Sequence, residues 1–596
     1  MKKLALVLAV VMVLSLGLTA CGGSTSSTGT ASSAPAGSSS SGSASDAAPA
    51  YNPDALQVKA LDDNTLQVTL TARTPYFLEL TAFPAYAPVQ QATVEANGEA
   101  WAVDAATYIG NGPYKIAEWV PSSHITMVKN ENYWNVDSLA GPDTLQFTLM
   151  EDDAAQLTAF QSGELDFIDA VPNDEIDTLS STPEFYKEGQ IGTYYVSYNT
   201  QAAPFDDPLV RQAFTLAVDR DYICKQIGKS GQIPAGASVS EGLSDAAEGS
   251  SFREVGGDYY DPTAGANEAN LAKAKELLAE AGYPNSEGLP TITYLYNEGT
   301  AHQQIGEALQ QMWGQLGATV TLESQEWATF LNTRKNGDYQ VARNGWLGDY
   351  NDPISFLDMW ITGGGNNDAQ WSNAEFDSLI KQIKSSGDAE ARMEMMHQAE
   401  DIIFDEWMLC PIYYYVDIYM AQQNLENLST SPLGFKFFMN ASNGTDTLKV
   451  CTGPDPDTID PALNSAVDGG TMIDHAFEGL YTVAYGTTPT PGQAESVEIS
   501  EDGLTYTFHL REGLKWSDGT PLTAHDFVYS WQRAVDPATG ADYAYMFECI
   551  AGYTEAINGE EYVAPAADAS SASTSESAAE SVSASTSESA STSAAA

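Results

Sequence analysis

Residues 291–322 read TITYLYNEGTAHQQIGEALQQMWGQLGATVTL, and three local patterns follow one another in this stretch. Thr291 to Tyr296 alternates as a strand does. Ile305 to Leu316 carries apolar residues at helical spacing and stops at Gly317, a common helix end. Thr319 to Leu322 is strand-like again. The stretch predicts a β-α-β unit and a mixed α/β class.

The neighbouring sequence adds a helix, and the N-terminal part adds a hairpin. Asn270 to Ala281 has apolar residues at helical spacing and ends at Gly282. Leu56 to Val58 and Thr65 to Leu70 flank a short polar run and predict a β-hairpin.

Two further elements are predicted near the C-terminus. Leu504 to Leu510 alternates as a strand. Thr523 and Asp526 have the spacing of a capping box, in which each side chain accepts from the other residue's backbone N–H. A helix is therefore expected to begin there.

The N-terminus has the features of an export signal. Lys2 and Lys3 precede an apolar run from Leu4 to Leu18, and the run leads to Leu18-Thr19-Ala20-Cys21, which is similar to a bacterial lipobox. We predict a signal peptide over residues 1–20 and a lipid anchor on Cys21, which would hold the chain at the outer face of the cell membrane. The alternative is a soluble secreted protein with an incidental cysteine.

Two low-complexity stretches lie near the ends of the chain. Residues 21–50 are rich in Gly, Ser, Thr and Ala and predict a flexible spacer. Residues 564–596 repeat Ser, Ala and Glu and predict a disordered tail. Roughly five hundred residues between them suffice for two or three domains with apolar cores.

The charge balance limits the partners of the chain. It has 81 acidic and 25 basic residues and a formal net charge of −56, with no basic cluster. Nucleic acid is therefore a poor candidate partner, and cationic or amine-bearing ligands are better ones. The alternative is a solvated acidic surface that keeps the protein soluble.

The sequence offers no positive sign of an enzyme. Its six histidines are scattered singly, and no HExxH, GxSxG or phosphate-binding GxxxxGK[ST] motif occurs. We predict neither a metal site nor a cofactor. The cysteines other than Cys21 form no CxxC pair, and a disulfide and buried free thiols are both open: they are Cys224, Cys410, Cys451 and Cys549.

Several motifs together resemble the oligopeptide-binding proteins of bacterial ABC importers, a family of solute-binding lipoproteins. The similarity covers most of residues 55–562. The motifs that carry it are Gly110-Asn111-Gly112-Pro113-Tyr114-Lys115, Asn132-Tyr133-Trp134, Pro204-Phe205-Asp206-Asp207 with Val210-Arg211-Gln212-Ala213, Gln325-Glu326-Trp327, Gly345-Trp346-Leu347-Gly348-Asp349-Tyr350-Asn351-Asp352-Pro353, Phe477-Glu478-Gly479-Leu480 and Lys515-Trp516-Ser517-Asp518-Gly519-Thr520-Pro521.

The order of these motifs departs from the family. In relatives the segment similar to Thr445–Tyr562 comes first, and the segment similar to Ala55–Asn440 follows it. The chain therefore looks like a circular permutant, with the family's usual ends joined around Asn443-Gly444-Thr445. The alternative is an assembly or gene-prediction error.

The resemblance implies a two-lobed periplasmic-binding-protein-like fold with a third, smaller domain. The implied domains are discontinuous in sequence: 55–137 with 480–562 for the small domain, 138–230 with 425–444 and 445–479 for lobe I, and 231–424 for lobe II.

The resemblance also assigns binding roles. Asp349 would pair with the α-ammonium of a peptide, although by itself it reads as a turn cap before Pro353. The backbone of Gly345 to Leu347 would pair with an extended peptide as an added strand. This main-chain pairing would ignore the identity of the ligand's side chains.

The other expected site residues are aromatic or basic. Trp346, Trp327 and Tyr543 would line side-chain pockets, with ordinary core packing as the alternative. Arg334 and Arg343 would lie near the ligand's carboxylate end, with structural salt bridges as the alternative. Ser465 stands where relatives carry a cleft glutamate, with Asp468 nearby, which puts a preference for basic side chains in doubt.

The function implied is the capture of oligopeptides between the lobes and their delivery to the permease subunits of an ABC importer. We expect the chain to act as a monomer outside the cell. Three alternatives stay open at this stage: a peptide sensor or chaperone without an import role, the same fold binding a dipeptide or another small solute, and a surface hydrolase.

Overall fold

The structure is a computed structural model that describes residues 51–484 and 488–564. The predicted signal peptide, the lipid anchor on Cys21, the spacer and the tail from residue 565 onward lie outside the described residues. Among the described helices, none has the length and apolar character needed to cross a membrane.

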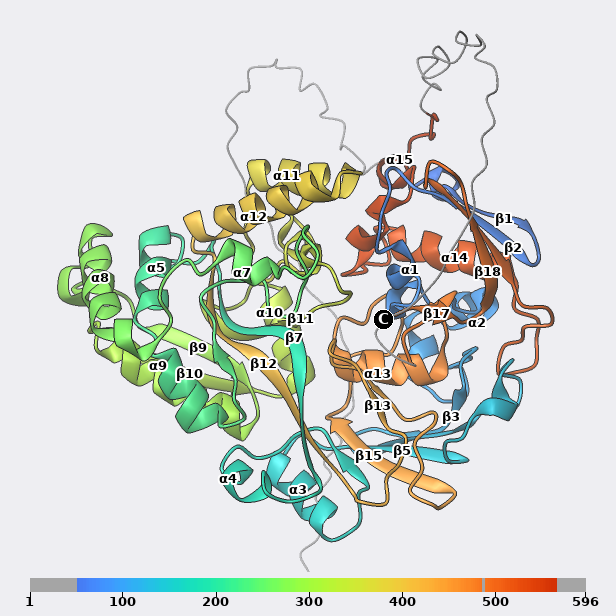
Figure 1. Cartoon of the computed structure of the whole chain (residues 1–596), viewed down its shortest axis with the longest axis horizontal. Helices are drawn as coiled ribbons and strands as arrows, with labels where there is room; N and C mark the ends of the chain where they lie inside the picture. Colours follow the sequence, from blue (N-terminus) through green and yellow to red (C-terminus); the bar gives the residue numbers. More distant parts are fainter. Residues whose placement is uncertain (1–50, 485–487, 565–596) are drawn as a thin grey trace, which may run out of the picture. The chain divides into compact units, whose positions relative to one another are not determined.

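The largest element of the fold is an eleven-stranded mixed sheet (Figure 1). Its strands follow the order β10-β9-β11-β7-β12-β6-β15-β5-β4-β3, and β8 pairs with β12 outside this path. Their bounds are β3 Tyr114–Val120, β4 His124–Lys129, β5 Thr144–Leu149, β6 Phe167–Ile168, β7 Phe185–Tyr198, β8 Ile233–Pro234, β9 Ile292–Asn297, β10 Val320–Gln325, β11 Val341–Leu347, β12 Leu409–Ala421 and β15 Thr447–Gly453.

Two long antiparallel strands, β7 and β12, join the two parts of this sheet. They pair from Leu409↔Ser197 to Met420↔Phe185, and two register shifts interrupt the ladder near its middle. We call the part with β3, β4, β5, β15 and β6 lobe I, and the part with β9, β10 and β11 lobe II. The chain thus has the two-lobed α/β architecture that the sequence predicted.

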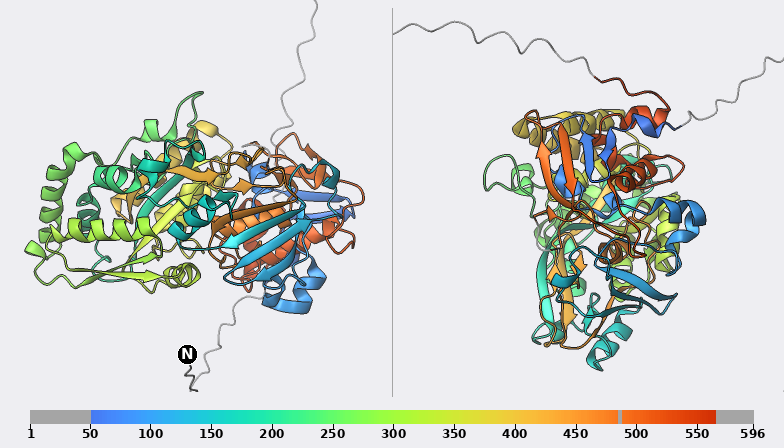
Figure 2. Two further views of the ribbon diagram at one scale, coloured as in Figure 1. Left: turned by 90° about the horizontal axis from the view of Figure 1, so that it is seen from below. Right: turned by 90° about the vertical axis from the view of Figure 1, so that its right-hand side faces the viewer.

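Helices cover the strands of both lobes (Figures 1 and 2). In lobe II, apolar side chains of α5, α8 and α9 pack with those of β9 and β11 into one core, in which Trp313 is fully buried. The α-helices are α1 Phe77–Leu80, α2 Gln91–Asn97, α3 Asp153–Gln161, α4 Ile176–Leu179, α5 Pro208–Leu216, α6 Arg220–Tyr222, α7 Phe252–Gly256, α8 Asn267–Glu280, α9 Thr300–Gly314, α10 Trp327–Lys335, α11 Ala374–Ser385, α12 Ala389–Asp405, α13 Val467–Ala476, α14 Ala524–Val535 and α15 Tyr553–Asn558.

A separate four-stranded antiparallel sheet combines the two ends of the sequence. Its order is β1-β2-β19-β18, so that strands from residues 58–69 pair directly with strands from residues 494–510 (Figures 1 and 2). The strands are β1 Val58–Asp62, β2 Thr65–Thr69, β18 Ala494–Ile499 and β19 Thr505–Leu510. Together with α14 and the 3-10 helix η10, Ala544–Cys549, this sheet forms what we call the small unit. Two two-stranded pairs complete the fold: β13 Ser429–Thr430 with β14 Lys436–Phe437, and β16 Tyr481–Thr482 with β17 Thr490–Pro491.

The local predictions agree with these elements. The β-α-β unit is confirmed, because β9 and β10 pair in parallel and α9 connects them, although α9 begins at Thr300 rather than Ile305. The β1–β2 hairpin, helix α8 and the predicted strand β19 are also present, although the first hairpin strand runs over Val58–Asp62 rather than Leu56 to Val58. Thr523 and Asp526 form the predicted capping box at the start of α14. Of the two alternatives for the cysteines, the structure has free thiols, and all four are buried.

The predicted domain boundaries stay a prediction, and the sheet pairing differs from them at one point. Residues 55–137 were assigned to the small domain, yet β3 and β4 lie within this range and extend the large sheet. The reason is main-chain pairing: β4 bonds to β5 from His124↔Thr148 to Val128↔Thr144, and β3 bonds to β4.

The Gly110-Asn111-Gly112 motif marks a close approach between the two halves of the sequence. The Gly112 N–H donates to the carbonyl oxygen of Ala476 at 2.9 Å, at the end of α13. A Cβ built on Gly112 would lie 2.6 Å from the carbonyl carbon of Ala476, which leaves no room for a side chain. The Asn111 side-chain NH₂ donates to the Glu478 carbonyl oxygen at 2.8 Å, and its side-chain carbonyl oxygen accepts the Glu478 backbone N–H at 3.1 Å.

We predict that Gly112→Ala lowers the free energy of unfolding by about 1–3 kcal/mol, because the new methyl group meets backbone atoms that cannot rotate away. Urea unfolding followed by tryptophan fluorescence measures this change. Gly314→Ala is the matched control, because a Cβ there meets nothing within 4 Å and the residue lies in α9, where alanine is favoured. Equal effects of the two substitutions would contradict the prediction.

Candidate ligand-binding cleft

A cavity of about 400 Å³ lies where the two lobes face each other. Residues from both lobes and from the small unit line it, and its volume falls in the usual range for ligand sites. In lobe I the cavity follows the ends of the parallel strands β5 and β15, and in lobe II it follows the ends of the parallel strands β9 and β10. Ligands of open α/β sheets bind at such carboxyl ends.

Strand β11 presents a free main-chain edge along this cavity. One of its edges pairs with β7 over its whole length, from Val341↔Tyr198 to Leu347↔Gly192. On the other edge only Val341 and Ala342 pair with β9. Within the described residues no strand pairs with that edge from residue 343 to residue 347, and Gly345, Trp346 and Leu347 line the cavity.

Asp349 follows this free edge directly and has no basic partner among the described residues. The Tyr543 hydroxyl donates to Oδ1 of Asp349 at 2.9 Å, and the Ser355 hydroxyl oxygen lies 3.4 Å from Oδ2. Ser355 also accepts the backbone N–H of Asp349 at 2.8 Å. Burial raises the pKa of Asp349 well above its ordinary value, and the two hydroxyl contacts offset this only in part. A cation at this point of the cavity would stabilise the carboxylate.

The three aromatic residues predicted for the site all line the cavity. Trp346 donates its indole N–H to the Ser355 carbonyl oxygen at 2.7 Å, which fixes its ring beside Tyr543. Tyr543, 5 % exposed, reaches the cavity from the small unit. Trp327 begins α10 directly after β10. The ligand contacts of these rings stay a prediction.

The two predicted arginines differ in their surroundings. Arg334 forms an ion pair of 2.6 Å with Asp368 and is almost fully buried, as expected from the salt-bridge alternative. Arg343 has no carboxylate within ion-pair distance among the described residues. Its guanidinium lies 5.2 Å from the centre of the Tyr194 ring and 3.5 Å from the Tyr415 hydroxyl oxygen. Arg343 is therefore free to meet an anionic group of a ligand.

Sequence reasoning missed several polar residues that line the cavity. Glu151 follows β5, while Asn297 ends β9 and Glu298 comes next. The rule that parallel strands direct their carboxyl ends at a ligand would have found the last two, because the β-α-β unit was recognised. Gln156 in α3 carried no such signal.

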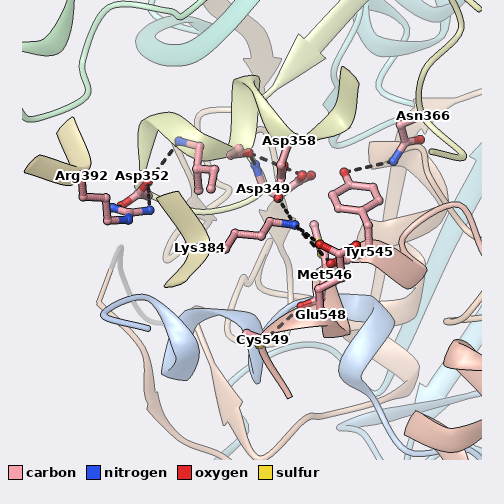
Figure 3. Close-up of polar contacts among 12 residues, drawn as sticks. Asp349, Asp352, Asp358, Asn366, Lys384, Arg392, Tyr545, Met546, Glu548 and Cys549 are labelled. Atoms are coloured by element: carbon pink, nitrogen blue, oxygen red, sulfur yellow. Dashed lines mark hydrogen bonds and ion pairs between the residues drawn. The ribbon is translucent and has the colours of Figure 1, made fainter. Parts of the chain in front are cut away.

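Ion pairs connect α10 and α11 with the small unit beside the cavity. The Lys384 ammonium of α11 lies 3.1 Å from the Asp358 carboxylate and 3.0 Å from the Glu548 carboxylate of η10 (Figure 3). The Asn366 amide donates to the Tyr545 hydroxyl at 3.3 Å in the same region (Figure 3). Lys335, which lines the cavity, pairs with Asp542 at 2.6 Å. The structure therefore holds the two sides of the cleft together.

No group of three or more His, Cys, Asp or Glu side chains in residues 51–484 and 488–564 is arranged to hold a metal ion. What the cavity offers is main-chain donors and acceptors, aromatic walls and charged groups.

A two-lobed sheet with a cleft at its strand ends, an open strand edge and separate charged groups defines an extracellular solute-binding protein. The model of the family described as "Bacterial extracellular solute-binding proteins, family 5 Middle" matches residues 27–368 and 488–586, and the chain belongs to this family. The family consists of binding proteins and not of enzymes.

Curated relatives and solved structures agree with this family. The chain is 37% identical over 385 residues to the dipeptide-binding protein DppE of Bacillus subtilis, covering 64% of this chain and 69% of that protein. It is 36% identical over 400 residues to the oligopeptide-binding protein OppA of the same organism, covering 65% and 71%.

Among solved structures, Haemophilus influenzae OppA in complex with the peptide RPPGFSPFR is similar with a TM-score of 0.57 and 29% identity, over 62% of this chain and 71% of that one. The murein tripeptide-binding protein MppA of Escherichia coli matches with a TM-score of 0.57 and 30% identity, over 64% and 72%.

We predict that Asp349 in the ligand-free protein titrates well above an ordinary aspartate, and that Tyr543→Phe raises its pKa further because the hydroxyl hydrogen bond is lost. Carboxyl carbon NMR of Asp-labelled protein measures both values, and Asp349→Asn identifies the signal. Tyr296→Phe is the matched control, because this tyrosine in lobe II makes no contact with Asp349. A normal titration of Asp349, or a pKa that falls in Tyr543→Phe, contradicts the prediction.

Proposed function

We propose that the chain captures oligopeptides in this cleft and delivers them to an ABC importer. The observation that carries the proposal is the free edge of β11, which runs along the cavity and ends at the unpaired carboxylate of Asp349. A peptide that added a strand to this edge would bond through its own main chain, whatever its side chains. Its α-ammonium would then meet Asp349 in a charge-assisted bond.

The spacing of the charged groups favours oligopeptides over dipeptides. Asp349 and Arg343 are six residues apart on β11 and the turn after it, a span of at most about 20 Å in an extended chain. A dipeptide spans about 7 Å, whereas the extended stretch of β11 from Arg343 to Leu347 alone covers about 13 Å, before the turn that carries Asp349. A peptide of several residues can place its ammonium at Asp349 and its carboxylate near Arg343.

The same structure suggests how capture and release work. β7 and β12 are the long strands that connect the lobes, and their ladder is irregular near Gly189 and Val416. Bending there would open the cleft, and the ion pairs of Lys384 and Lys335 would re-form on closure.

We predict that Asp349→Asn weakens the binding of a tetra- or pentapeptide by about 10- to 100-fold, the loss of one charge-assisted bond of about 1.5–3 kcal/mol. N-terminal acetylation of the peptide should weaken its binding to the unsubstituted protein by a similar factor. Asp349→Asn and acetylation together should lower the affinity little more than either change alone, because both remove the same contact. Isothermal titration calorimetry measures the four affinities, and Glu276→Gln, an exposed carboxylate on α8, is the control.

The affinity should also fall as the pH is lowered. Bound ammonium would hold Asp349 ionised, whereas burial raises its pKa in the ligand-free protein, so that binding releases a proton near that pKa. Affinity is therefore highest above the ligand-free pKa and declines below it, and Asp349→Asn removes this dependence. Additive losses from acetylation and Asp349→Asn, or no peptide binding at all, would sink the proposal.

We infer that the chain is exported and lipid-anchored through Cys21. The support is the lipobox-like sequence together with membership of an extracellular family. Metabolic labelling with palmitate checks this, and incorporation that persists in Cys21→Ser rules the anchor out.

We also propose that the two halves of the chain are circularly permuted. The backbone N–H of Asn52 donates to the Ala556 carbonyl oxygen at 2.9 Å, so that the first and last described segments lie side by side, as a cut through one surface loop requires. The alignment with DppE spans 385 residues, close to the length of residues 55–440, as expected when a collinear match stops at the join. A rearranged chain with 445–562 placed before 55–440 should fold and bind peptide with unchanged affinity; failure to fold contradicts the proposal.

A further inference from the structure

One end of the cavity gathers hydrogen-bond acceptors around Trp327. Glu151, Glu298 and Asp468 line the cavity there. Trp327 lines the same cavity, and neither its indole N–H nor Oδ2 of Asp468 has a hydrogen-bond partner. Lobe I, lobe II and α13 thus each contribute one carboxylate to the wall of the cavity.

Two buried amide side chains in the cavity also offer hydrogen-bond acceptors without a donor. Gln156 is 1 % exposed and Asn297 is 8 % exposed, and both line the cavity. Each uses its NH₂ group within the protein: Gln156 donates to the Met150 carbonyl oxygen at 2.7 Å, and Asn297 donates to the Glu298 carbonyl oxygen at 3.1 Å. Their carbonyl oxygens have no hydrogen-bond partner, and neither has Oε1 of Glu151. Buried acceptors without donors are rare, because each one costs free energy.

The protein itself supplies no cation to these groups. Within the described residues no Lys, Arg or His side chain lies within 4.0 Å of the carboxylates of Glu151, Glu298 or Asp468. The nearby basic residues of the cavity, Arg334 and Lys335, are paired with Asp368 and Asp542. Burial raises the pKa of Glu151 to about 7 and that of Asp468 to about 6, as expected for carboxylates without a counter-ion.

We propose that this end of the cavity is a subsite for a basic side chain of the bound peptide, lysine or arginine, and that Glu151, Asp468, Gln156 and Asn297 accept its N–H groups. The inference rests on the proposed function and names the class of peptide. A protonated amine or guanidinium carries only donors, and the unpartnered groups at this end of the cavity are mostly acceptors: Oε1 of Glu151, Oδ2 of Asp468 and the amide oxygens of Gln156 and Asn297, beside a single donor, the Trp327 indole N–H. Trp327 would add an aromatic wall for the aliphatic stem or the cation.

The proposal differs from the expectation drawn from the sequence. Ser465 stands where relatives carry a cleft glutamate, which puts a preference for basic side chains in doubt. In the fold, Ser465 lines the cavity and donates its hydroxyl to Asp542 at 3.1 Å. The acidic groups come instead from the ends of β5 and β9 and the start of α13. A metal ion is a poorer occupant, because no metal-binding arrangement of three such side chains exists among the described residues.

The test compares pentapeptides of alanine in which lysine, norleucine or N-acetyl-lysine replaces one residue at each position in turn. Norleucine keeps the aliphatic stem and acetyl-lysine keeps the length, and both lack the charge. Titration calorimetry with the full chain should find one position at which lysine binds at least about tenfold tighter than norleucine. Glu151→Gln should reduce the ratio of the lysine-peptide affinity to the norleucine-peptide affinity. The double variant Glu151→Gln with Asp468→Asn should bring this ratio below about twofold. Glu276→Gln is the control.

The outcomes separate this inference from the proposed function. If all pentapeptides bind equally well and still depend on Asp349, only the basic subsite is wrong. If none binds, the inference and the proposed function fail together. Unchanged affinity for the all-alanine peptide shows that the variants are folded, so that a lysine preference that survives the double substitution overturns the inference. Cadaverine, a free diamine, is titrated alone, and binding as tight as that of the lysine peptide would assign the subsite to free amines instead.

Discussion

The antiparallel ladder between β7 and β12 is the constraint on which the rest of the structure depends. These strands carry the large sheet from lobe I into lobe II, and their residues Gln190 and Tyr415 line the cavity. Because the ladder fixes both lobes to one pair of strands, the carboxyl ends of β5 and β15 are set opposite those of β9 and β10. The position of the cleft therefore follows from sheet topology before any side chain is considered.

The contrast between paired and unpaired charges identifies what the cleft is for. Elsewhere in the fold several buried charges are matched: Arg392 with Asp352 at 2.7 Å and Arg253 with Glu400 at 2.8 Å, for example (Figure 3 shows the first pair). At the cleft wall, the carboxylates of Asp349 and Glu151 and the guanidinium of Arg343 have no such partner among the described residues. Since an unpaired charge away from water is costly, a fold that keeps several in one cavity is prepared for a ligand of complementary charge.

The two halves of the sequence depend on each other for folding. Glu478 lies in the C-terminal half, and its carboxylate accepts the Tyr133 hydroxyl at 2.6 Å and the Trp134 indole N–H at 2.7 Å, both from the N-terminal half. The small unit likewise needs strands from both halves. Contacts between motifs that are far apart in the sequence therefore restrict which residue types fit there. Gly112 is an example, because a side chain at this position would meet the backbone of Ala476.

Local pattern was enough to predict the β9–α9–β10 unit, the β1–β2 hairpin and the α14 capping box, because strand alternation, helical spacing and caps act over a few residues. Family motifs also led to eight residues that all line one cavity. The sequence could not reveal that Arg334 forms an ion pair with Asp368 whereas Arg343 has no carboxylate partner among the described residues. It also could not reveal that β3 and β4 join the large sheet. It also gave no sign that Glu151 and Gln156 line the same cavity as Trp327. Those facts depend on which distant segments the fold brings together, and a carboxylate has the same appearance in a sequence whether its neighbour in space is an arginine, another carboxylate or an empty cavity.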